Sequence, residues 1–346
     1  MGERRAPHAR GDRGGRPMSA RPDVSIVIVT YNSLGVIGSC LDALTRDGAP
    51  PVGAEVIVID NLSADDTVEM LRARYPWVRV VENDSNAGFS RAVNLAATHA
   101  RGRHLLLLNP DARISAEGVA RLSALLDADP SIGAAAPVLE NEGEEVVILA
   151  AGHAPTMTKM FLHQSGLSRL GRRWSILEGH YLFAADVRDG VRDVDWVSGG
   201  CLMVPVDTWR RAGGLTDRWF MYAEDVEFCL RLRAAGLRVV IDAGERAHHA
   251  LGGSSSGVEG AVNTAWIVNL FDLYGWRMAR SDRQQRLWRA IVLAGMHGRL
   301  WWFRASTLRG RDRQAAAAQI RRFGIYASAL RRAPLTSDRE PFSRSL

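Results

Sequence analysis

The sequence is poor in cysteine and has no long hydrophobic run. Its three cysteines are too few and too widely spaced for a disulfide framework or a zinc site. The most apolar run, Ile291–Phe303, is interrupted by His297 and Arg299 and falls short of the ~18–20 residues that span a bilayer. These absences exclude a disulfide-stapled secreted domain and a polytopic membrane protein, and reduced cysteines favour a cytoplasmic location.

The middle of the chain lacks net positive charge, although the whole chain carries a net charge of +6. Residues 1–22 hold six arginines and two acidic residues, and residues 277–346 hold sixteen arginines and four acidic residues. The residues between them are therefore net acidic. Because residues 1–22 are also rich in glycine and proline and have no apolar segment directly behind them, we expect a disordered basic arm rather than a secretory signal.

Apolar runs and helical patterns alternate along the first part of the chain. Buried strands are predicted at Val24–Thr30, Glu55–Asp60, Val78–Val81 and His104–Leu108, and helices at Leu34–Thr45, Ala64–Arg74 and Gly88–Ala100. This alternation predicts βαβ units and hence an α/β fold with a doubly wound sheet. Ligands of such sheets bind beyond the carboxyl ends of the strands, so the polar residues that follow each strand are the candidates for chemistry.

The remainder of the chain is organised differently. Gly133–Leu139 and Glu145–Ala150 are expected to pair as strands, residues 151–192 to form a long irregular segment, and the pattern from Val258 onward is helical throughout. We therefore expect four parts, namely a disordered basic arm (1–22), an α/β domain (23–257), a basic helical extension (258–334) and a flexible tail (335–346).

Polar residues follow the first three predicted strands. Thr30 and Asn32 stand where a dinucleotide-binding domain would carry G-x-G-x-x-G, which is absent. Asp60, at the end of the second strand, can accept hydrogen bonds from a ring N–H or a ribose hydroxyl, or can be an ordinary polar strand exit. After the third strand, Asn86 precedes Gly88, which permits close approach of the chain to a ligand.

The fourth strand ends in Asn-Pro-Asp, and a histidine pair stands near the end of the α/β region. Asp111 is presented at the sheet edge, where a hard divalent cation and a diphosphate could be held, although Asn-Pro-Asp is also a common turn. His248 and His249 precede a Gly-Gly-Ser turn, and for them a metal or phosphate role stands beside an ordinary structural one. Either histidine is a candidate ligand.

An aromatic cluster, Trp219–Tyr222, comes just before the acidic residues Glu224, Asp225 and Glu227. Acidic residues at a helix start can simply compensate the helix dipole, and we favour this role for Glu227. The aromatic residues before Glu224 and Asp225 would partly desolvate a carboxylate and raise its pKa, as a general base requires.

Seven segments along residues 24–254 resemble, in order, the family 2 inverting glycosyltransferases of the GT-A fold, and among them the bacterial rhamnosyltransferases. The segments read VSIVIVTYNS, EVIVIDNLSADDT, NAGFSRAVNLA, LLLLNPD, WVSGGCLMV, GGLTDRWFMYAEDVEFCLRLRAAG and HHALGGS. The resemblance implies a GT-A doubly wound mixed sheet for residues 23–257. One departure is that the usual Gly-Gly-Phe-Asp reads Gly-Gly-Leu-Thr here, followed by Asp217, which points to a local change on the acceptor side.

The resemblance also implies roles for single residues. Those implied to bind the nucleotide sugar are Thr30, Asn32, Asp60, Asn86, Gly88, Asp111 and Glu224. Asp111, from the family's D-x-D motif, and His249, from its H-x-x-G-x-S motif, would hold a divalent cation, either Mg²⁺ or Mn²⁺. Since Asn-Pro-Asp keeps only one of the two carboxylates, the metal would be held weakly or would depend on the diphosphate. Asp225, the second residue of the family's Glu-Asp pair, would be the catalytic base.

The reaction that the resemblance implies is transfer of a sugar from a nucleoside diphosphate to a hydroxyl, with inversion. The favoured donor is dTDP-rhamnose, and the acceptor is a cell-envelope glycan or a polyprenyl-linked molecule expected to contact residues 151–192. The alternatives are a UDP-sugar-dependent transferase and a non-catalytic sugar-nucleotide-binding or scaffold protein of the same fold. A nucleotidyltransferase is disfavoured, because Tyr31–Gly38 lacks the basic residues of that class's first loop.

The C-terminal helical extension combines tryptophan with arginine. Trp276, Trp288, Trp301 and Trp302 are interleaved with many arginines over residues 276–332. Such a stretch suits an anionic membrane surface, which would place the protein peripherally on the inner face of the cell membrane; the alternative is a helical cap with a solvated arginine face. We expect no nucleic-acid partner, because the chemistry expected of the residues at the sheet edge does not involve a nucleic acid.

Overall fold

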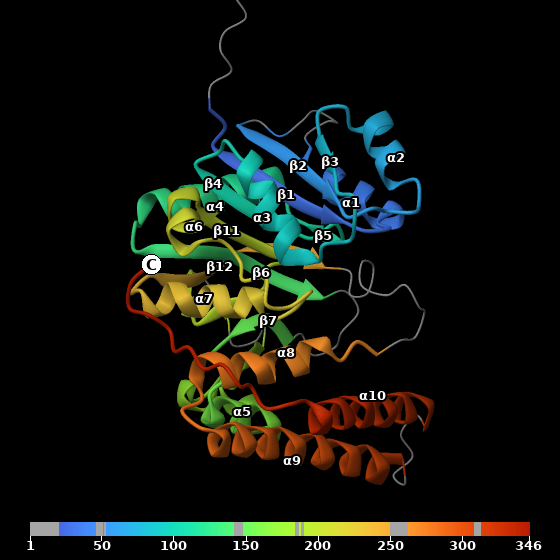
Figure 1. Cartoon of the computed structure of the whole chain (residues 1–346), viewed down its shortest axis with the longest axis vertical. Helices are drawn as coiled ribbons and strands as arrows, with labels where there is room; N and C mark the ends of the chain where they lie inside the picture. Colours follow the sequence, from blue (N-terminus) through green and yellow to red (C-terminus); the bar gives the residue numbers. More distant parts are fainter. Residues whose placement is uncertain are drawn as a thin grey trace, which may run out of the picture.

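The computed structural model describes residues 21–45, 51, 53–141, 148–183, 187, 190–249, 262–307 and 313–346. Almost all of the expected basic arm, and the Gly-Gly-Ser turn after the histidine pair, lie outside these residues. Figure 1 shows the large sheet and its helices in the upper part of the view and the C-terminal helices at the opposite end.

A mixed nine-stranded sheet carries the described part of the fold. Its parallel half comprises β3 (Arg79–Glu82), β2 (Ala54–Asp60), β1 (Val24–Thr30) and β4 (His104–Leu108), with the helices α1 (Leu34–Leu44), α2 (Thr67–Arg74) and α3 (Phe89–His99). In the sheet, β1 lies between β2 and β4 and is parallel to both. Nearly all β-branched and leucine side chains of β1, β2 and β4 are buried on both faces, as a parallel sheet requires, and the predicted α/β fold is confirmed.

The other half of the sheet contains both strand directions. It comprises β11 (Cys201–Pro205), β6 (Ile132–Asn141), β12 (Arg238–His249), β9 (Val191–Val194) and β5 (Ala112–Arg113), with the helices α4 (Ala116–Ala128), α6 (Val206–Ala212) and α7 (Glu224–Ala234). Here β11 is antiparallel to β4, whereas β6 and β12 pair in parallel with each other. The last residues of β12 pair with β5, which places the histidine pair beside the Asn-Pro-Asp turn.

A second, three-stranded sheet corrects one expectation. It comprises β7 (Ile148–Gly152), β8 (Tyr181–Phe183) and β10 (Trp196–Val197). The expected pairing of Gly133–Leu139 with Glu145–Ala150 is wrong: β6 already has β11 and β12 on its two edges, so β7 pairs with β8 and β10 instead.

The segment that was expected to be irregular contains helices. They are α5 (Met157–Ser165) and the short 3₁₀ helices η1 (Leu167–Leu170) and η2 (Ser175–Leu177). The Thr156 hydroxyl accepts a hydrogen bond from the Lys159 N–H at 3.2 Å and so caps the start of α5. The sequence signal of this helix is one N-cap threonine followed by weak periodicity.

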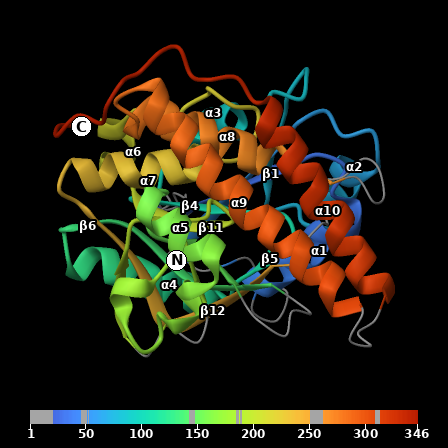
Figure 2. The ribbon, with the colours of Figure 1, turned by 90° about the horizontal axis from the view of Figure 1, so that it is seen from below.

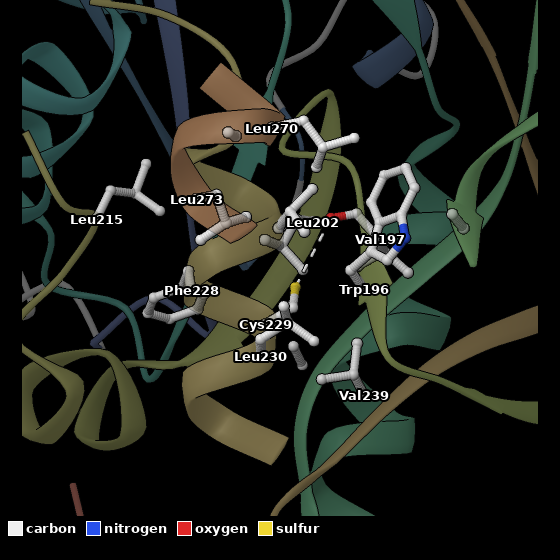
Figure 3. Packing of buried hydrophobic residues seen from close by; sticks show 14 of the residues in the cluster. Trp196, Val197, Leu202, Leu215, Phe228, Cys229, Leu230, Val239, Leu270 and Leu273 are labelled. Carbon is white, nitrogen blue, oxygen red and sulfur yellow. Dashed lines mark hydrogen bonds between the residues drawn. The ribbon is translucent and has the colours of Figure 1, made fainter. Parts of the chain in front are cut away.

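The C-terminal helices share a hydrophobic core with the α/β part. They are α8 (Ala265–Leu273), the π-helical turn η4 (Tyr274–Met278), α9 (Asp282–Thr307) and α10 (Arg313–Arg332). Figure 3 shows Leu270 and Leu273 of α8 near Phe228 of α7, where the Cys229 thiol donates to the carbonyl of Val197 at 3.7 Å. Nowhere in the described ranges does a helix combine the length and apolarity needed to cross a membrane.

The last residues of the chain lie against the protein, which differs from the expected flexible tail. Arg218, just before the aromatic cluster, pairs with Asp338 at 2.6 Å, and Arg277 donates to the carbonyl of Glu340 at 3.0 Å. Such ion pairs and backbone hydrogen bonds tie residues 335–346 to η4 and to the segment that leads into α7.

Candidate active site

The exits of β1 and β2 are joined by the carboxylate of Asp60. In the parallel register Thr30 lies opposite Asp60, and the Thr30 hydroxyl donates to Asp60 Oδ1 at 2.8 Å. The N–H and the hydroxyl of Ser63 also donate to this carboxylate, at 2.8 and 2.6 Å. Asp60 is 2% exposed, so it acts first as the organiser of the loop that follows β2.

Asn32 ties the two exit loops together. Its backbone has a φ of 50°, in the left-handed region that asparagine tolerates better than most residues. Its N–H donates to the Ser63 hydroxyl at 2.8 Å, and its side-chain oxygen accepts from the Ala64 N–H at 2.7 Å. The sequence-predicted residues Thr30, Asn32 and Asp60 therefore form one hydrogen-bonded edge.

The Asn86–Gly88 loop connects this edge with the segment before α7. The Asn61 amide donates to the carbonyl of Gly88 at 3.2 Å, and the Asn86 side chain accepts from the Gly88 N–H at 3.2 Å. Gly88 has a φ of 81°, and a Cβ there would lie 2.5 Å from the carbonyl oxygen of Phe220. Only glycine fits this approach, and the Phe89 N–H donates to the same carbonyl at 3.0 Å.

Asp111 and His249 lie together because β5 pairs with the end of β12. Their side chains approach to 3.1 Å between Asp111 Oδ1 and His249 Nε2, and the Asn109 amide lies 3.3 Å from the same imidazole nitrogen. Asp111 is buried, and the His249 side chain is 17% exposed. His248 is exposed and, as its neighbour along a strand, points to the other face, so the geometry brings His249 to Asp111.

The pair of Asp111 and His249 suits a divalent cation only in part. One carboxylate and one imidazole are acceptable donors, but such ions take about six ligands. In the described ranges no group of three or more histidine, cysteine, aspartate or glutamate side chains is placed to hold a metal ion. The residues present therefore fit a divalent cation only if most of its ligands come from outside the described part of the chain.

The turn that leads into α7 has an unusual backbone. Tyr222 and Ala223 are consecutive non-glycine residues with φ values of 71° and 78°, and such strain concentrates at functional sites. Asn269, on α8, donates from its amide to the carbonyls of Met221 at 2.7 Å and Tyr222 at 3.2 Å. Sequence analysis missed Asn269, because a single asparagine in an apolar helix is no signal until the fold brings α8 against the turn.

Glu224 and Asp225 follow this turn at the start of α7. Asp225 accepts hydrogen bonds from the N–H groups of Gly199 at 2.9 Å and Val226 at 2.8 Å. Burial raises the pKa of Asp225, although these hydrogen bonds oppose the effect. Burial and the nearby charge of Asp225 raise the pKa of Glu224 to about 8, and Glu224 Oε2 has no hydrogen-bond partner among the residues that the structure describes.

The Gly199–Gly200 turn brings the acidic pair and the Asn-Pro-Asp turn together. On one side, a Cβ at Gly199 would lie 3.3 Å from the Phe89 ring and 3.6 Å from the Cβ of Asp225. On the other, the Asn109 N–H donates to the carbonyl of Gly200 at 2.9 Å. The Gly199–Gly200 turn thus contacts Asp225 on one side and the start of the Asn-Pro-Asp turn on the other, at the edge of the sheet where ligands of such folds bind.

Two acidic residues near the site have roles that the sequence did not reveal. Glu227 does not compensate a solvated helix end: it is fully buried and pairs with Arg231 at 2.8 Å and Arg277 at 2.7 Å, which joins α7 to η4. Asp217, which follows the departure from Gly-Gly-Phe-Asp, pairs at the surface with Arg91 at 3.2 Å.

Comparisons with known proteins show which proteins this chain resembles. Residues 25–176 match the profile of glycosyl transferase family 2. An N-acetylglucosaminyl-diphospho-decaprenol L-rhamnosyltransferase of Mycobacterium tuberculosis is 29% identical over 240 residues, which cover 65% of this chain and 75% of the relative. A low-salt glycan biosynthesis hexosyltransferase of Haloferax volcanii is 24% identical over 229 residues, which cover 64% of this chain and 66% of the relative.

Similarity to solved structures extends over most of the chain. A mannosyltransferase from Pyrobaculum calidifontis, solved in complex with GDP-Man and Mn²⁺, matches with a TM-score of 0.56 and 17% identity over 90% of this chain and 87% of its own. This likeness bears on the fold and confirms the predicted GT-A architecture. The chain is therefore a glycosyltransferase that matches family 2 over residues 25–176, has the GT-A fold and resembles bacterial rhamnosyltransferases.

Proposed function

We propose that the chain transfers rhamnose from dTDP-rhamnose to a hydroxyl of a polyprenyl-linked or cell-envelope glycan acceptor, with inversion at the anomeric carbon. The observation that carries the catalytic part is the convergence, around the Gly199–Gly200 turn, of Asp225 with the pair of Asp111 and His249. A carboxylate base on one side and a diphosphate site on the other are what a single displacement needs.

Asp225 is the base of this proposal. Its carboxylate takes the proton of the acceptor hydroxyl as the oxygen attacks the anomeric carbon from the face opposite the diphosphate. The bond from that carbon to the diphosphate oxygen breaks, and the electron pair leaves with the nucleoside diphosphate. Because burial raises the pKa of Asp225, its carboxylate is a stronger base than an exposed aspartate would be.

The diphosphate lies at Asp111 and His249 in this proposal. These two residues would hold a divalent cation, Mg²⁺ or Mn²⁺, which supplies charge neutralisation to the departing diphosphate when it is bound. The position of Asp111 directly before β5, which pairs with the end of β12 and so brings His249 to it, supports this assignment.

The nucleoside and the sugar occupy the remaining edge. We assign the base and ribose of the donor to the loops organised by Thr30, Asn32 and Asp60. The Gly88 turn, with Asn86, lies beside these loops, and there the backbone can approach the nucleotide closely. We assign Glu224 Oε2, which is buried and without a hydrogen-bond partner in the described part of the chain, to a hydrogen bond with a sugar hydroxyl. A polar group so buried is costly unless a ligand satisfies it.

The acceptor assignment rests on the Mycobacterium relative, which is named as an N-acetylglucosaminyl-diphospho-decaprenol L-rhamnosyltransferase. For a lipid-linked acceptor we propose a catalytic domain at residues 23–257, a basic helical extension at 258–334, and a peripheral position of both on the inner face of the membrane. The arginine-rich helices α9 and α10 support this placement through their charge.

Thermal-shift measurements with free nucleotides test the donor assignment. We expect dTDP to raise the melting temperature more than UDP or GDP, and the gain to increase when Mn²⁺ is added. A larger shift with UDP would replace the donor by a UDP-sugar. Binding of nucleotide without transfer from any donor in a panel of sugar nucleotides would point to the non-catalytic alternative.

A further inference from the structure

Residues 157–177, from α5 to η2, expose an unusual combination of side chains. Five large apolar residues in this stretch are exposed, by fractions from 41% to 80%: Phe161, Leu167, Leu170, Trp174 and Ile176. The stretch holds no acidic residue and four basic ones, of which Arg169, Arg172 and Arg173 are exposed. A monomeric protein in water seldom gathers apolar tips and uncompensated arginines in one short segment.

The outer face of α9 carries the same combination. Its inner face buries Trp288, Val292 and Met296, while Leu287, Trp301 and Trp302 are exposed, Trp301 by 72%. Arg283, Arg286 and Arg304 are also exposed on this helix. Of the fourteen large hydrophobic residues found exposed in the described ranges, eight belong to α9 or to the stretch 161–176.

These two segments lie side by side. The Arg299 guanidinium on α9 donates to the carbonyl of His163 on α5 at 3.1 Å. The helices approach so closely that a Cβ at Gly295 would lie 2.3 Å from the Cβ of Gln164. Burial, and after it the positive charge of Arg169, lower the pKa of Arg299, which places η1 near α9 as well. Figure 1 shows α5, α9 and α10 together at the end of the molecule away from α2, and Figure 2, seen from that end, shows α5 next to α9.

We propose that residues 161–176 and the outer face of α9 form one membrane-docking surface that binds an anionic lipid bilayer. Trp and aliphatic tips enter the headgroup region, and the arginines pair with lipid phosphates. A lipid surface is favoured over a protein partner because the exposed apolar residues alternate with exposed arginines along the chain. The inference rests on the proposed function in one respect, that a polyprenyl-linked acceptor lies in that same bilayer.

Co-sedimentation of the full chain with vesicles tests this surface. We expect binding to phosphatidylcholine vesicles that contain phosphatidylglycerol, little binding to phosphatidylcholine alone, and weakening by salt. Arg169→Gln/Arg172→Gln/Arg173→Gln should reduce the binding constant tenfold or more. Trp174→Ser/Ile176→Ser should do so too, because it removes the apolar part of the contact.

Matched control variants keep the test specific. The triple substitution Arg72→Gln/Arg74→Gln/Arg210→Gln removes as much exposed positive charge from α2 and α6, and Leu95→Ser/Val191→Ser removes exposed apolar residues elsewhere; both should bind like the parent chain.

Three outcomes would overturn the proposal. They are equal binding to neutral vesicles, equal loss in the controls, and light scattering that shows a dimer dissociated by the Trp174→Ser/Ile176→Ser change, which would make this face an interface between copies. Vesicle binding is measured without any sugar transfer. A chain that does not bind vesicles would therefore contradict the docking surface and not the proposed reaction, and a chain without transferase activity could still bind vesicles.

Discussion

Substitution of Asn269 by alanine tests whether the turn before α7 is held in place by the C-terminal helices. The amide of Asn269 makes two hydrogen bonds, at 2.7 and 3.2 Å, to the carbonyls of Met221 and Tyr222. Each such bond contributes about 1 kcal/mol, so the variant loses about 2 kcal/mol of restraint. The two left-handed residues that this restraint holds each cost on the order of 1–3 kcal/mol, so the turn is free to relax once the restraint is removed.

Relaxation of the turn would displace Glu224 and Asp225, which follow it directly. We expect kcat to fall by about tenfold to a hundredfold, since 1.4 kcal/mol corresponds to a factor of ten in rate. KM for the donor should change less than kcat, because the edge formed by Thr30 and Asp60 is held by its own hydrogen bonds and only Glu224, among the proposed donor contacts, follows the turn. Steady-state kinetics with separate donor and acceptor titrations would measure both quantities.

Asn94→Ala is the matched control. Asn94 also makes two hydrogen bonds to backbone, at 2.8 and 3.0 Å, to the carbonyl and the N–H of Leu215. It should lower the melting temperature about as much as Asn269→Ala while kcat stays within about threefold of the parent chain. Equal losses of kcat in both variants, or an unchanged kcat in Asn269→Ala, would refute a positioning role for Asn269.

Three further predictions concern acidic residues. Glu227→Gln should lower the free energy of unfolding in urea by about 3 kcal/mol, since it breaks a buried pairing with two arginines; a change below 1 kcal/mol would contradict this. Asp111→Asn should raise the Mn²⁺ concentration for half-maximal transfer at least tenfold, and an unchanged metal dependence would remove Asp111 from the site. The pKa of Glu224 is raised to about 8 in the folded chain. Between the ordinary pKa of a glutamate and about pH 8, the folded chain therefore keeps a proton on Glu224 that the unfolded chain has lost. The free energy of unfolding should therefore fall as pH rises through this range, and Glu224→Gln should reduce the fall. A melting temperature that drops equally between pH 5 and pH 8 in the parent chain and in Glu224→Gln would contradict this prediction.

Much of the sheet edge could be predicted from sequence because strand exits are local features. Runs such as Val24–Thr30 identify buried parallel strands, and the carboxyl ends of such strands meet, so Thr30, Asp60 and Asp111 could be placed on one edge before any coordinates. The pairing of Asp111 with His249 was reached only through the family resemblance. The register of β12 against β5 then shows why His249, and not His248, lies next to Asp111.

Features that depend on long-range packing could not be predicted. The burial of Glu227 requires Arg277, fifty residues later, to fold back onto α7. Asn269 and the C-terminal residues likewise gain their roles only when α8 lies against the turn before α7. Helix α5 packs against α9 on one side and exposes Phe161 on the other. Because an apolar residue on the exposed side weakens the hydrophobic periodicity of a helix, the sequence of segment 157–177 did not predict one.

The central claim is that Asp225 is the base of a sugar-nucleotide-dependent transfer, and Asp225→Asn tests it most directly. Asparagine keeps the size of the side chain and one hydrogen-bond acceptor but takes no proton, so the variant should lose transfer by at least a thousandfold. Nucleotide affinity, measured by calorimetry with the diphosphate and Mn²⁺, should remain within about threefold of the parent chain. Transfer that survives in Asp225→Asn, or nucleotide binding that is lost together with transfer, would contradict the account.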